Sequence, residues 1–206
     1  MKKIVIGLCF ILLLAGFVFA VNNQGIQAQD GTGAYHEAVI AAGGQGNATQ
    51  SRVVAGDYTG QKGERIQLKE KENKRIQLRV GNVSADCGCN MTQERIQNRT
   101  KLNIKLSNGR NAEVKVMPDT ASENALQRLR LKVCSEENNC TLELKEVGKG
   151  NQTRAVYELK TRRNSKFLGL FKTRMNVQAQ VDSETGEIFS VKKPWWAFLA
   201  TEPLEK

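Results

Sequence analysis

Two segments in which apolar and polar residues alternate constrain the fold of this chain most strongly. Alternation with a period of two places the apolar side chains on one face of a β-strand, which is typical of half-buried strands. The segment RIQLKEKENKRIQLRV, residues 65–80, alternates twice, and the polar residues 69–73 between the two runs supply a turn. This pattern predicts a first β-hairpin.

A second hairpin is expected in KLNIKLSNGRNAEVKVMP, and its register can be derived. A two-residue Asn-Gly loop would place Ile104 opposite Glu113 and bring a charge onto the apolar face. A three-residue loop, residues 107–109, instead pairs Ile104 with Ala112. Gly109 would then take the left-handed position of a bulged turn, so the hydrophobic pattern favours this register.

A helix is expected directly after the second hairpin. Pro118 stands at its start, and Thr120 with Glu123 forms a capping box, a common signal for a helix N-terminus. The apolar residues with helical spacing are Ala125, Leu126, Leu129 and Val133. Strand-like stretches follow at residues 141–147, 154–161, 167–181 and 187–192, and a polar DSETGE turn joins the last two. The order of the elements predicts an α+β fold of antiparallel hairpin sheets with one main helix.

The N-terminus predicts export. Residues 1–20, MKKIVIGLCFILLLAGFVFA, combine two lysines, an apolar run and a small residue at its end, as a signal peptide does. The run is also long enough to remain as a membrane anchor, and both alternatives stay open. Either one predicts an extracytoplasmic protein, secreted or anchored by this segment. Residues 21–63 are rich in Gly, Gln and Asn and predict a flexible tether, which holds the only histidine, His36.

The region after the second hairpin resembles a known family. A helix, a Tyr-x-hydrophobic strand and a closing Asp-x-x-Thr-Gly-Glu hairpin make residues 118–192 similar to a PepSY-type module. The matching residues are Tyr157, Asp182, Thr185, Gly186 and Glu187. The stretch from about Val80 to the C-terminal tail, residues 193–206, also resembles uncharacterised exported proteins of archaea. PepSY modules are exported or membrane-facing, and some are associated with peptidase propeptides. The resemblance therefore implies a binding or regulatory module, preceded by a β-hairpin region at 64–117.

Cysteines outside the N-terminal segment predict a disulfide framework, because their number is even and the chain is expected to be exported. They are Cys87, Cys89, Cys134 and Cys140. In an extended strand the first two would lie about 6.6 Å apart, at the limit for bridging each other. We therefore favour links from this pair to the second pair. A local bridge within the second pair and a four-thiolate zinc site are the alternatives, and we assign no metal.

Asn-x-Ser/Thr triplets recur more often than chance placement in this composition would give, and each is a candidate glycosylation site. The asparagines are Asn47, Asn82, Asn90, Asn98, Asn139 and Asn151. Asparagine and threonine are also common in turns, so the same triplets can belong to turn sequences. The sequence leaves both interpretations open.

The charge distribution predicts an anionic partner. The chain has 31 basic and 21 acidic residues, a formal net charge of +10. The stretch 160–174 holds bases and no acid, and its binding candidates are Arg162, Arg163, Lys166, Lys172 and Arg174. We expect an anionic surface or an envelope protein as the partner. Nucleic acid is not favoured, because no stacking array of aromatic residues accompanies these bases.

Two adjacent tryptophans in the C-terminal tail, Trp195 and Trp196, are further binding candidates. In one interpretation the tail folds back and Trp196 packs on the open face of the sheet. In the other, the pair enters a membrane interface and makes a membrane contact. Neighbouring side chains of an extended chain point in opposite directions, so one can pack while the other stays accessible.

Patterns for catalysis and cofactor binding are missing from the sequence. The single histidine lies in the expected tether, so no Ser-His-Asp or Cys-His arrangement forms in the folded part. There is no P-loop and no dinucleotide fingerprint, and we expect no cofactor. The sequence predicts an exported, non-catalytic binding or regulatory module at the cell envelope. A structural, glycosylated envelope protein and a carboxylate-based enzyme are the alternatives.

Overall fold

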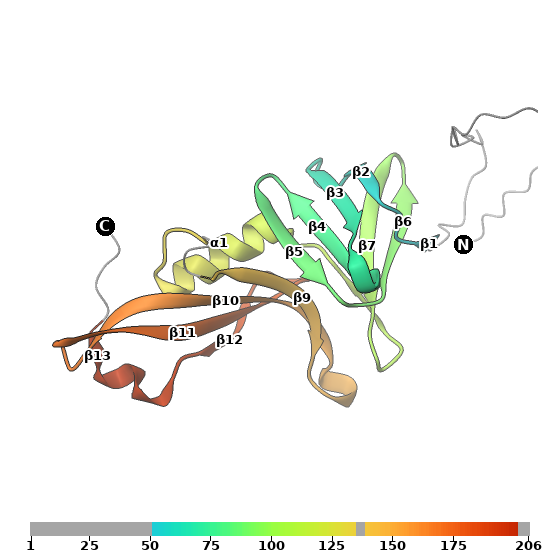
Figure 1. The fold of residues 1–206 in the computed structure, drawn as a ribbon. Coiled ribbons are helices and arrows are strands. Elements are labelled where there is room, and N and C mark those ends of the chain that lie inside the picture. Colours follow the sequence, from blue (N-terminus) through green and yellow to red (C-terminus); the bar gives the residue numbers. More distant parts are fainter. Residues whose placement is uncertain (1–50, 135–138, 202–206) are drawn as a thin grey trace, which may run out of the picture. The chain divides into compact units, whose positions relative to one another are not determined.

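The computed structural model describes residues 51–134 and 139–201, whose elements are labelled in Figure 1. These residues belong to the second of two units into which the chain divides, Gln45–Lys206. The expected signal peptide or anchor, most of the tether, His36 and Asn47 lie outside the described residues. The fold is mostly β-sheet with one α-helix, a mixed α+β fold in which nearly all strand pairs are antiparallel.

The smaller sheet has four strands in the order β1-β6-β7-β8. Their bounds are Ser51–Arg52, Met91–Ile96, Arg99–Lys105 and Asn111–Glu113. The predicted register of the second hairpin, β7–β8, is confirmed, since Ile104 lies opposite Ala112. Gly109 has a φ of +84°, and its amide donates to the Leu106 carbonyl at 3.0 Å, as the bulged three-residue loop requires.

The larger sheet follows the order β12-β11-β10-β9-β5-β4-β3-β2, and β13 pairs with β10 beside this path. The bounds in chain order are Gly56–Thr59 (β2), Arg65–Glu70 (β3), Ile76–Val80 (β4), Val83–Cys87 (β5), Thr141–Val147 (β9), Arg154–Phe167 (β10), Phe171–Asp182 (β11), Ile188–Lys192 (β12) and Ala200–Thr201 (β13). The predicted first hairpin is β3–β4, with Leu68 opposite Leu78. Its turn lies later than expected, around the short 3-10 helix η1 at Glu72–Lys74.

One parallel pair joins the regions that the sequence placed apart. Asp86 and Cys87 of β5 lie opposite Glu143 and Leu144 of β9, in the same strand direction. Strands from the β-hairpin region and from the PepSY-like region therefore share one sheet. A parallel pair needs a long crossover. Here the crossover from β5 to β9 contains β6, β7, β8 and the helix.

The helix α1 spans Pro118–Leu129, with Pro118 at its first position. The expected capping box is wrong, because the N-cap is Met117 and Thr120 already lies in the first turn. The helix ends at Arg130, which is left-handed with a φ of +55°. Val133 therefore follows the helix and is exposed rather than part of a buried stripe. The buried side chains of α1 are Pro118, Ala121, Ser122, Ala125 and Leu129.

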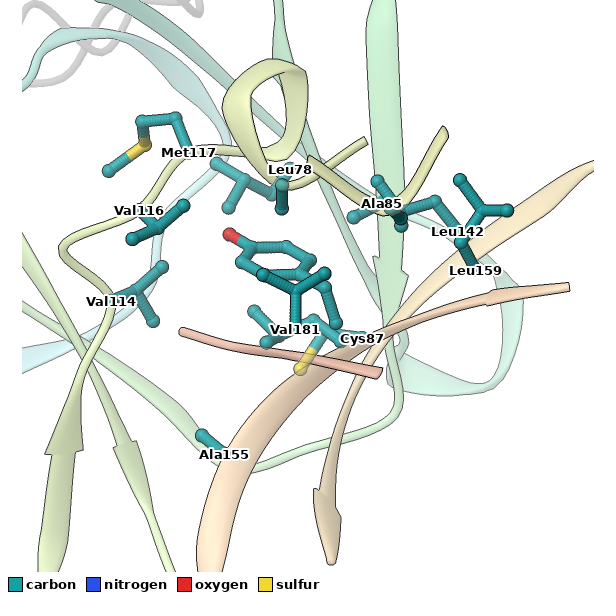
Figure 2. Packing of buried hydrophobic residues seen from close by; sticks show 14 of the residues in the cluster. Leu78, Ala85, Cys87, Val114, Val116, Met117, Leu142, Ala155, Leu159 and Val181 are labelled. Atoms are coloured by element: carbon teal, nitrogen blue, oxygen red, sulfur yellow. The ribbon is translucent and has the colours of Figure 1, made fainter. Parts of the chain in front are cut away.

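The hydrophobic core lies between α1 and one face of the larger sheet (Figure 1), and it also includes buried residues of the smaller sheet, such as Leu102 and Ile104. Its centre is formed by alternate residues of the middle strands, fully buried, including Leu144, Tyr157, Leu159, Met175 and Val181. Figure 2 shows Val114, Val116 and Met117, from the segment before the helix, lying near Leu78 and Val181. Alternation with period two thus decides which residues of β9, β10 and β11 face the helix.

The expected tether ends earlier than predicted. Residues 51–63 contain β1 and β2, which pair with β6 and β3. Val53 is buried, and the Tyr58 hydroxyl donates to the Val54 carbonyl at 2.8 Å. β1 is held by backbone pairing with the distant strand β6, and β2 by pairing with the next strand, β3. Neither pairing is visible as local hydrophobic periodicity in residues 51–63.

The strands β10 and β11 form a longer hairpin than the sequence indicated. We expected strands at 154–161 and 167–181, but β10 continues to Phe167, and the turn comprises residues 168–170. The missed part alternates regularly, with Arg163 and Ser165 buried and the residues between them exposed. Because these buried residues are polar, the strand gave no hydrophobic pattern.

A basic face on the β10–β11 hairpin

Alternate residues of the long hairpin bring the predicted basic stretch onto one face of the sheet. Lys166 lies opposite Lys172, and two residues further along each strand Arg174 lies opposite Asn164 on the same face. Further back, Lys160 lies opposite Gln178, which in turn lies opposite Lys192 of β12. All side chains of this set are exposed, and we call it the basic face: Lys160, Arg162, Lys166, Lys172, Arg174 and Lys192.

Two open hollows mark the basic face. One has a volume of about 530 Å³ and lies at Lys166, Lys172 and Arg174. The other has a volume of about 390 Å³ and is lined by cations together with uncharged residues; the cations are Lys160, Arg162, Lys192 and Lys193. No carboxylate lines either hollow, so both can accept anionic groups of a ligand or a surface.

Arg163 does not belong to this surface, which corrects its place among the binding candidates. Its side chain points to the helix side of β10, and the residue is 2% exposed. A guanidinium N–H donates to the carbonyl of Leu129 at 2.9 Å, at the C-terminal end of α1. A cation is favourable there, because the last carbonyls of a helix are partly negative and lack partners within the helix. Arg163 therefore fixes the helix to the hairpin.

A buried carboxylate, Glu158, organises the polar face beside the basic face. Its side chain is 2% exposed and accepts from Lys145 at 2.6 Å and from Lys160 at 2.7 Å. The side-chain amides of Gln178 and Gln180 also donate to it, the latter at 2.7 Å. Burial raises the pKa of Glu158, but the hydrogen bonds from the two lysines and Gln180 outweigh burial and lower the pKa to about 2. Glu158 thus stays ionised and holds Lys160 in place, and the same hydrogen bond raises the pKa of Lys160.

Carboxylates of three neighbouring strands form a row that ends at Glu158. Asp86 lies opposite Glu143, and Glu143 lies opposite Glu158. Lys71 binds Asp86 and Arg75 binds Glu143, each at 2.7 Å, beside an open hollow of about 770 Å³. Each carboxylate thus has its own cation. Within the described ranges, no group of three or more metal-ligating side chains could hold a metal ion.

The cysteines pair locally, and the favoured long-range links are wrong. Cys87 lies at disulfide distance from Cys89, and Cys134 from Cys140, with Cα–Cα distances of 5.1 and 5.2 Å. In the first pair, β5 ends at Cys87 and the chain bends at Cys89, which brings the two cysteines together. The second pair spans the connection from α1 to β9, which was one of the open alternatives.

The candidate glycosylation sites that the structure describes are all exposed and lie outside the strands, in connections between elements or in the short 3-10 helix Gly150–Gln152: Asn82, Asn90, Asn98, Asn139 and Asn151. Asn98 and Asn139 have positive φ, with values of +64° and +46°. Asparagine tolerates this conformation better than most residues, so backbone geometry accounts for these two. Backbone geometry gives no such reason for Asn82, Asn90 and Asn151, which do not have positive φ.

The two tryptophans have different environments. Trp196 packs edge-on against Phe167 with ring centroids 6.1 Å apart, whereas Trp195 is 81% exposed. Both belong to the short 3-10 helix η4, Trp195–Leu199, which connects β12 to β13. Because β12 pairs with β11 and β13 pairs with β10, the tail crosses the hairpin near its end. The expectation that one tryptophan packs and the other stays accessible agrees with this arrangement.

The residues that carry the PepSY resemblance have structural roles in this fold. Tyr157 is fully buried in the core. The carboxylate of Asp182 accepts from the amides of Glu184 and Thr185 at 2.9 and 3.1 Å, which closes the turn. Gly186 has a φ of +79°, as the expected polar turn requires.

Sequence reasoning missed Glu158 with Lys145, and it missed the turn at 168–170. For Glu158 a signal exists, since it is the only acid between the bases of β10 and it alternates with buried apolar residues. Its burial depends on partners from β9 and β11, which the sequence does not place beside it.

Comparison with known proteins gives no match: no family model fits the chain, and no curated protein or solved structure is significantly similar to it. Among the helices that the structure describes, none has the length and apolar character needed to cross a bilayer.

Proposed function

We propose that this chain is an exported, non-catalytic binding module at the cell envelope, and that the basic face receives an anionic ligand or surface. The observation that carries the proposal is the alignment of exposed cations along β10, β11 and β12. Two strands with alternating cations on one face give an extended positive surface rather than a single anion pocket. The PepSY resemblance, with its binding or regulatory modules, supports the same function.

The neighbouring carboxylates strengthen this surface rather than neutralise it. Glu158 is buried, and its carboxylate already accepts hydrogen bonds from Lys145, Lys160 and two glutamine amides. Its negative charge is therefore compensated by these partners and does not neutralise the exposed cations of the basic face. The cations nearest the end of the hairpin, Lys166 and Lys172, lie opposite each other. Like charges held this close repel each other unless an anion lies between them, and an anionic partner relieves that repulsion.

The experiment compares two variants that remove the same charge. The first neutralises the basic face with R162Q, K166Q, K172Q and R174Q. The second neutralises exposed cations elsewhere with R52Q, K62Q, K69Q and R95Q. The probe is dextran sulfate, with uncharged dextran as the blank, and the readout is the Kd of the full chain over a series of salt concentrations.

We expect the first variant to lose at least about tenfold in affinity, and the control to lose clearly less. The affinity of the wild type should also fall as salt rises, because salt screens charges on an exposed surface. Equal losses in the two variants would show that net charge alone attracts the polyanion, and the proposed role of the basic face would then be wrong.

A structural, glycosylated envelope protein is the second candidate. The exposure of Asn82, Asn90 and Asn151, at positions that backbone geometry does not reserve for asparagine, favours it. Mass spectrometry of the chain purified from its own host tests this function. Glycans on these asparagines would support it, and unmodified peptides that cover all three would exclude it.

A further inference from the structure

The largest exposed apolar side chains of this fold gather at one place. Among the residues that the structure describes, the four most exposed large hydrophobic side chains are Trp195, Leu170, Phe198 and Phe171, at 81, 77, 77 and 65%. Leu168 of the same turn is 55% exposed. Together we call these five residues the apolar tip. Exposed apolar residues that cluster, rather than scatter singly, mark an interaction site.

Backbone contacts hold the two halves of the apolar tip together. Leu168, Leu170 and Phe171 lie at the turn of the β10–β11 hairpin, whereas Trp195 and Phe198 belong to η4. The amide of Leu168 donates to the Leu199 carbonyl at 2.9 Å, directly after Phe198. β13 also pairs with the end of β10, beside the far end of the hairpin in Figure 1. The tip is therefore a fixed part of the fold.

Local structure does not explain the apolar residues at the turn. Leu168 has a φ of +52°, in the left-handed region that glycine, asparagine and aspartate tolerate best. A leucine there gains little from burial, because more than half of its side chain is exposed. Leu170 is still more exposed. An external apolar environment would give both side chains a stabilising contact that the fold itself does not provide.

Charge complementarity identifies that environment. Phe167 and Phe171 form the first cross-strand pair beside the turn, and Lys166 and Lys172 form the second. Arg174 lies two residues further along β11. These cations occupy the face opposite to Phe167 and Phe171, so they flank the apolar tip. Aromatic and aliphatic side chains at the level of the head groups, with lysine or arginine beside them, form the pattern of proteins that bind a bilayer interface.

We propose that the apolar tip enters the interface of a bilayer with anionic head groups, while Lys166, Lys172 and Arg174 bind those head groups. This inference rests on the proposed function of the basic face and names its partner. A bilayer suits the geometry better than a protein partner, because the side chains project from a turn and a short helix. The hollow beside them, at Trp195 and Trp196, has a volume of only about 240 Å³.

The test uses the emission of Trp195 in the full chain. In a W196F background Trp195 is the only tryptophan, and phenylalanine keeps an aromatic contact with Phe167. The protein is mixed with vesicles of phosphatidylcholine, alone or with phosphatidylglycerol, and with the same lipids brominated in their acyl chains. Quenching by the brominated lipid reports the depth of Trp195 itself, so it is independent of how the N-terminal segment meets the vesicle.

We expect a blue shift and quenching of Trp195 with the anionic vesicles. L170S/F171S should abolish the quenching, whereas the control V54S/I96S, which changes exposed apolar residues elsewhere, should keep it. K166Q/K172Q should weaken the partition of the chain onto anionic vesicles by about fivefold per cation. Binding of the wild type to dextran sulfate is measured alongside, because it reports the proposed function alone.

The outcomes separate the two proposals. An unquenched Trp195 with intact dextran sulfate binding overturns the bilayer inference and leaves the basic-face function standing. Loss of both signals overturns the function as well. Quenching that L170S/F171S leaves unchanged, or a blue shift that occurs without lipid through association between copies of the chain, would also overturn the inference.

Discussion

Replacing Glu158 by glutamine tests how the polar face is held together. The carboxylate is 2% exposed and binds Lys145 at 2.6 Å and Lys160 at 2.7 Å. Glutamine keeps the size of the side chain but removes its charge. Both lysines are then left without their partner, although each is partly exposed and can regain water.

The pKa of Glu158 gives the size of the expected loss of stability. Its pKa lies at about 2 in the folded chain, against an ordinary glutamate value of 4.5. Each pH unit between the unfolded and folded pKa corresponds to about 1.4 kcal/mol, so the ionised carboxylate contributes about 3 kcal/mol at neutral pH. Because the folded pKa is lowered, this stability is present above pH 4.5 and is lost as the pH falls towards 2.

The assay is urea denaturation followed by circular dichroism over a series of pH values. Glu158→Gln should lower the free energy of unfolding by about 3 kcal/mol at neutral pH, and the difference from the wild type should vanish near the folded pKa. Glu143→Gln is the control, since the Arg75–Glu143 pair is about one-third to two-fifths exposed and should contribute less than about 1 kcal/mol. A neutral-pH difference for Glu158→Gln as small as that of the control would refute this account, and so would a difference that does not depend on pH.

Three further predictions concern single sites. Trp196→Ala should lower the free energy of unfolding by about 2 kcal/mol because Trp196 packs on Phe167, whereas Trp195→Ala should be nearly neutral; equal effects in thermal denaturation would contradict the packing. Tyr157→Phe should be neutral or slightly stabilising, since the buried hydroxyl has no hydrogen-bond partner among the residues that the structure describes, and a loss above about 1 kcal/mol would show that it has one. Non-reducing peptide mapping should find two local cystines, Cys87–Cys89 and Cys134–Cys140, and a cross-link between the pairs would disprove this connectivity.

The sequence predicts those parts of the fold in which apolar residues alternate near a turn. The register of β7–β8 follows from the requirement that Ile104 and Ala112 share a face, together with a glycine at the only position that needs positive φ. Strand β9 was predicted with its observed bounds for the same reason. Local periodicity and turn chemistry suffice wherever both strands of a pair lie close in sequence.

Other parts depend on residues far apart along the chain. The parallel pairing of β5 with β9 brings Asp86 beside Glu143, and nothing local to either strand indicates it. The extension of β10 was missed because its buried residues, Arg163 and Ser165, are polar. The predicted cysteine pairing is wrong for a related reason: it requires an extended strand through Cys89, whereas β5 ends at Cys87 and the chain then bends.

The sequence predicts which stretch of basic residues carries the candidate site, but not which of its side chains share one face of the sheet. The sequence locates the acid-free stretch 160–174, but only the hairpin register separates Arg163, which faces the helix, from the exposed cations. The sequence does not predict the apolar tip either, because its residues come from two segments that only the fold brings together. Leu168, Leu170 and Phe171 looked like the start of a strand, and their proximity to Trp195 follows from the tail crossing the hairpin.

Differential labelling of lysines tests the central claim most directly, since it locates the binding surface on the unmodified chain. The full chain is acetylated briefly, with and without anionic phosphatidylglycerol vesicles, and the extent of labelling at each lysine is read by mass spectrometry. Lys166, Lys172 and Lys192 should be protected at low salt and become reactive again at high salt, whereas the exposed Lys62 and Lys69 should react equally in all conditions. Protection spread evenly over these lysines, or confined to Lys62 and Lys69, would contradict the assignment of the basic face as the binding surface.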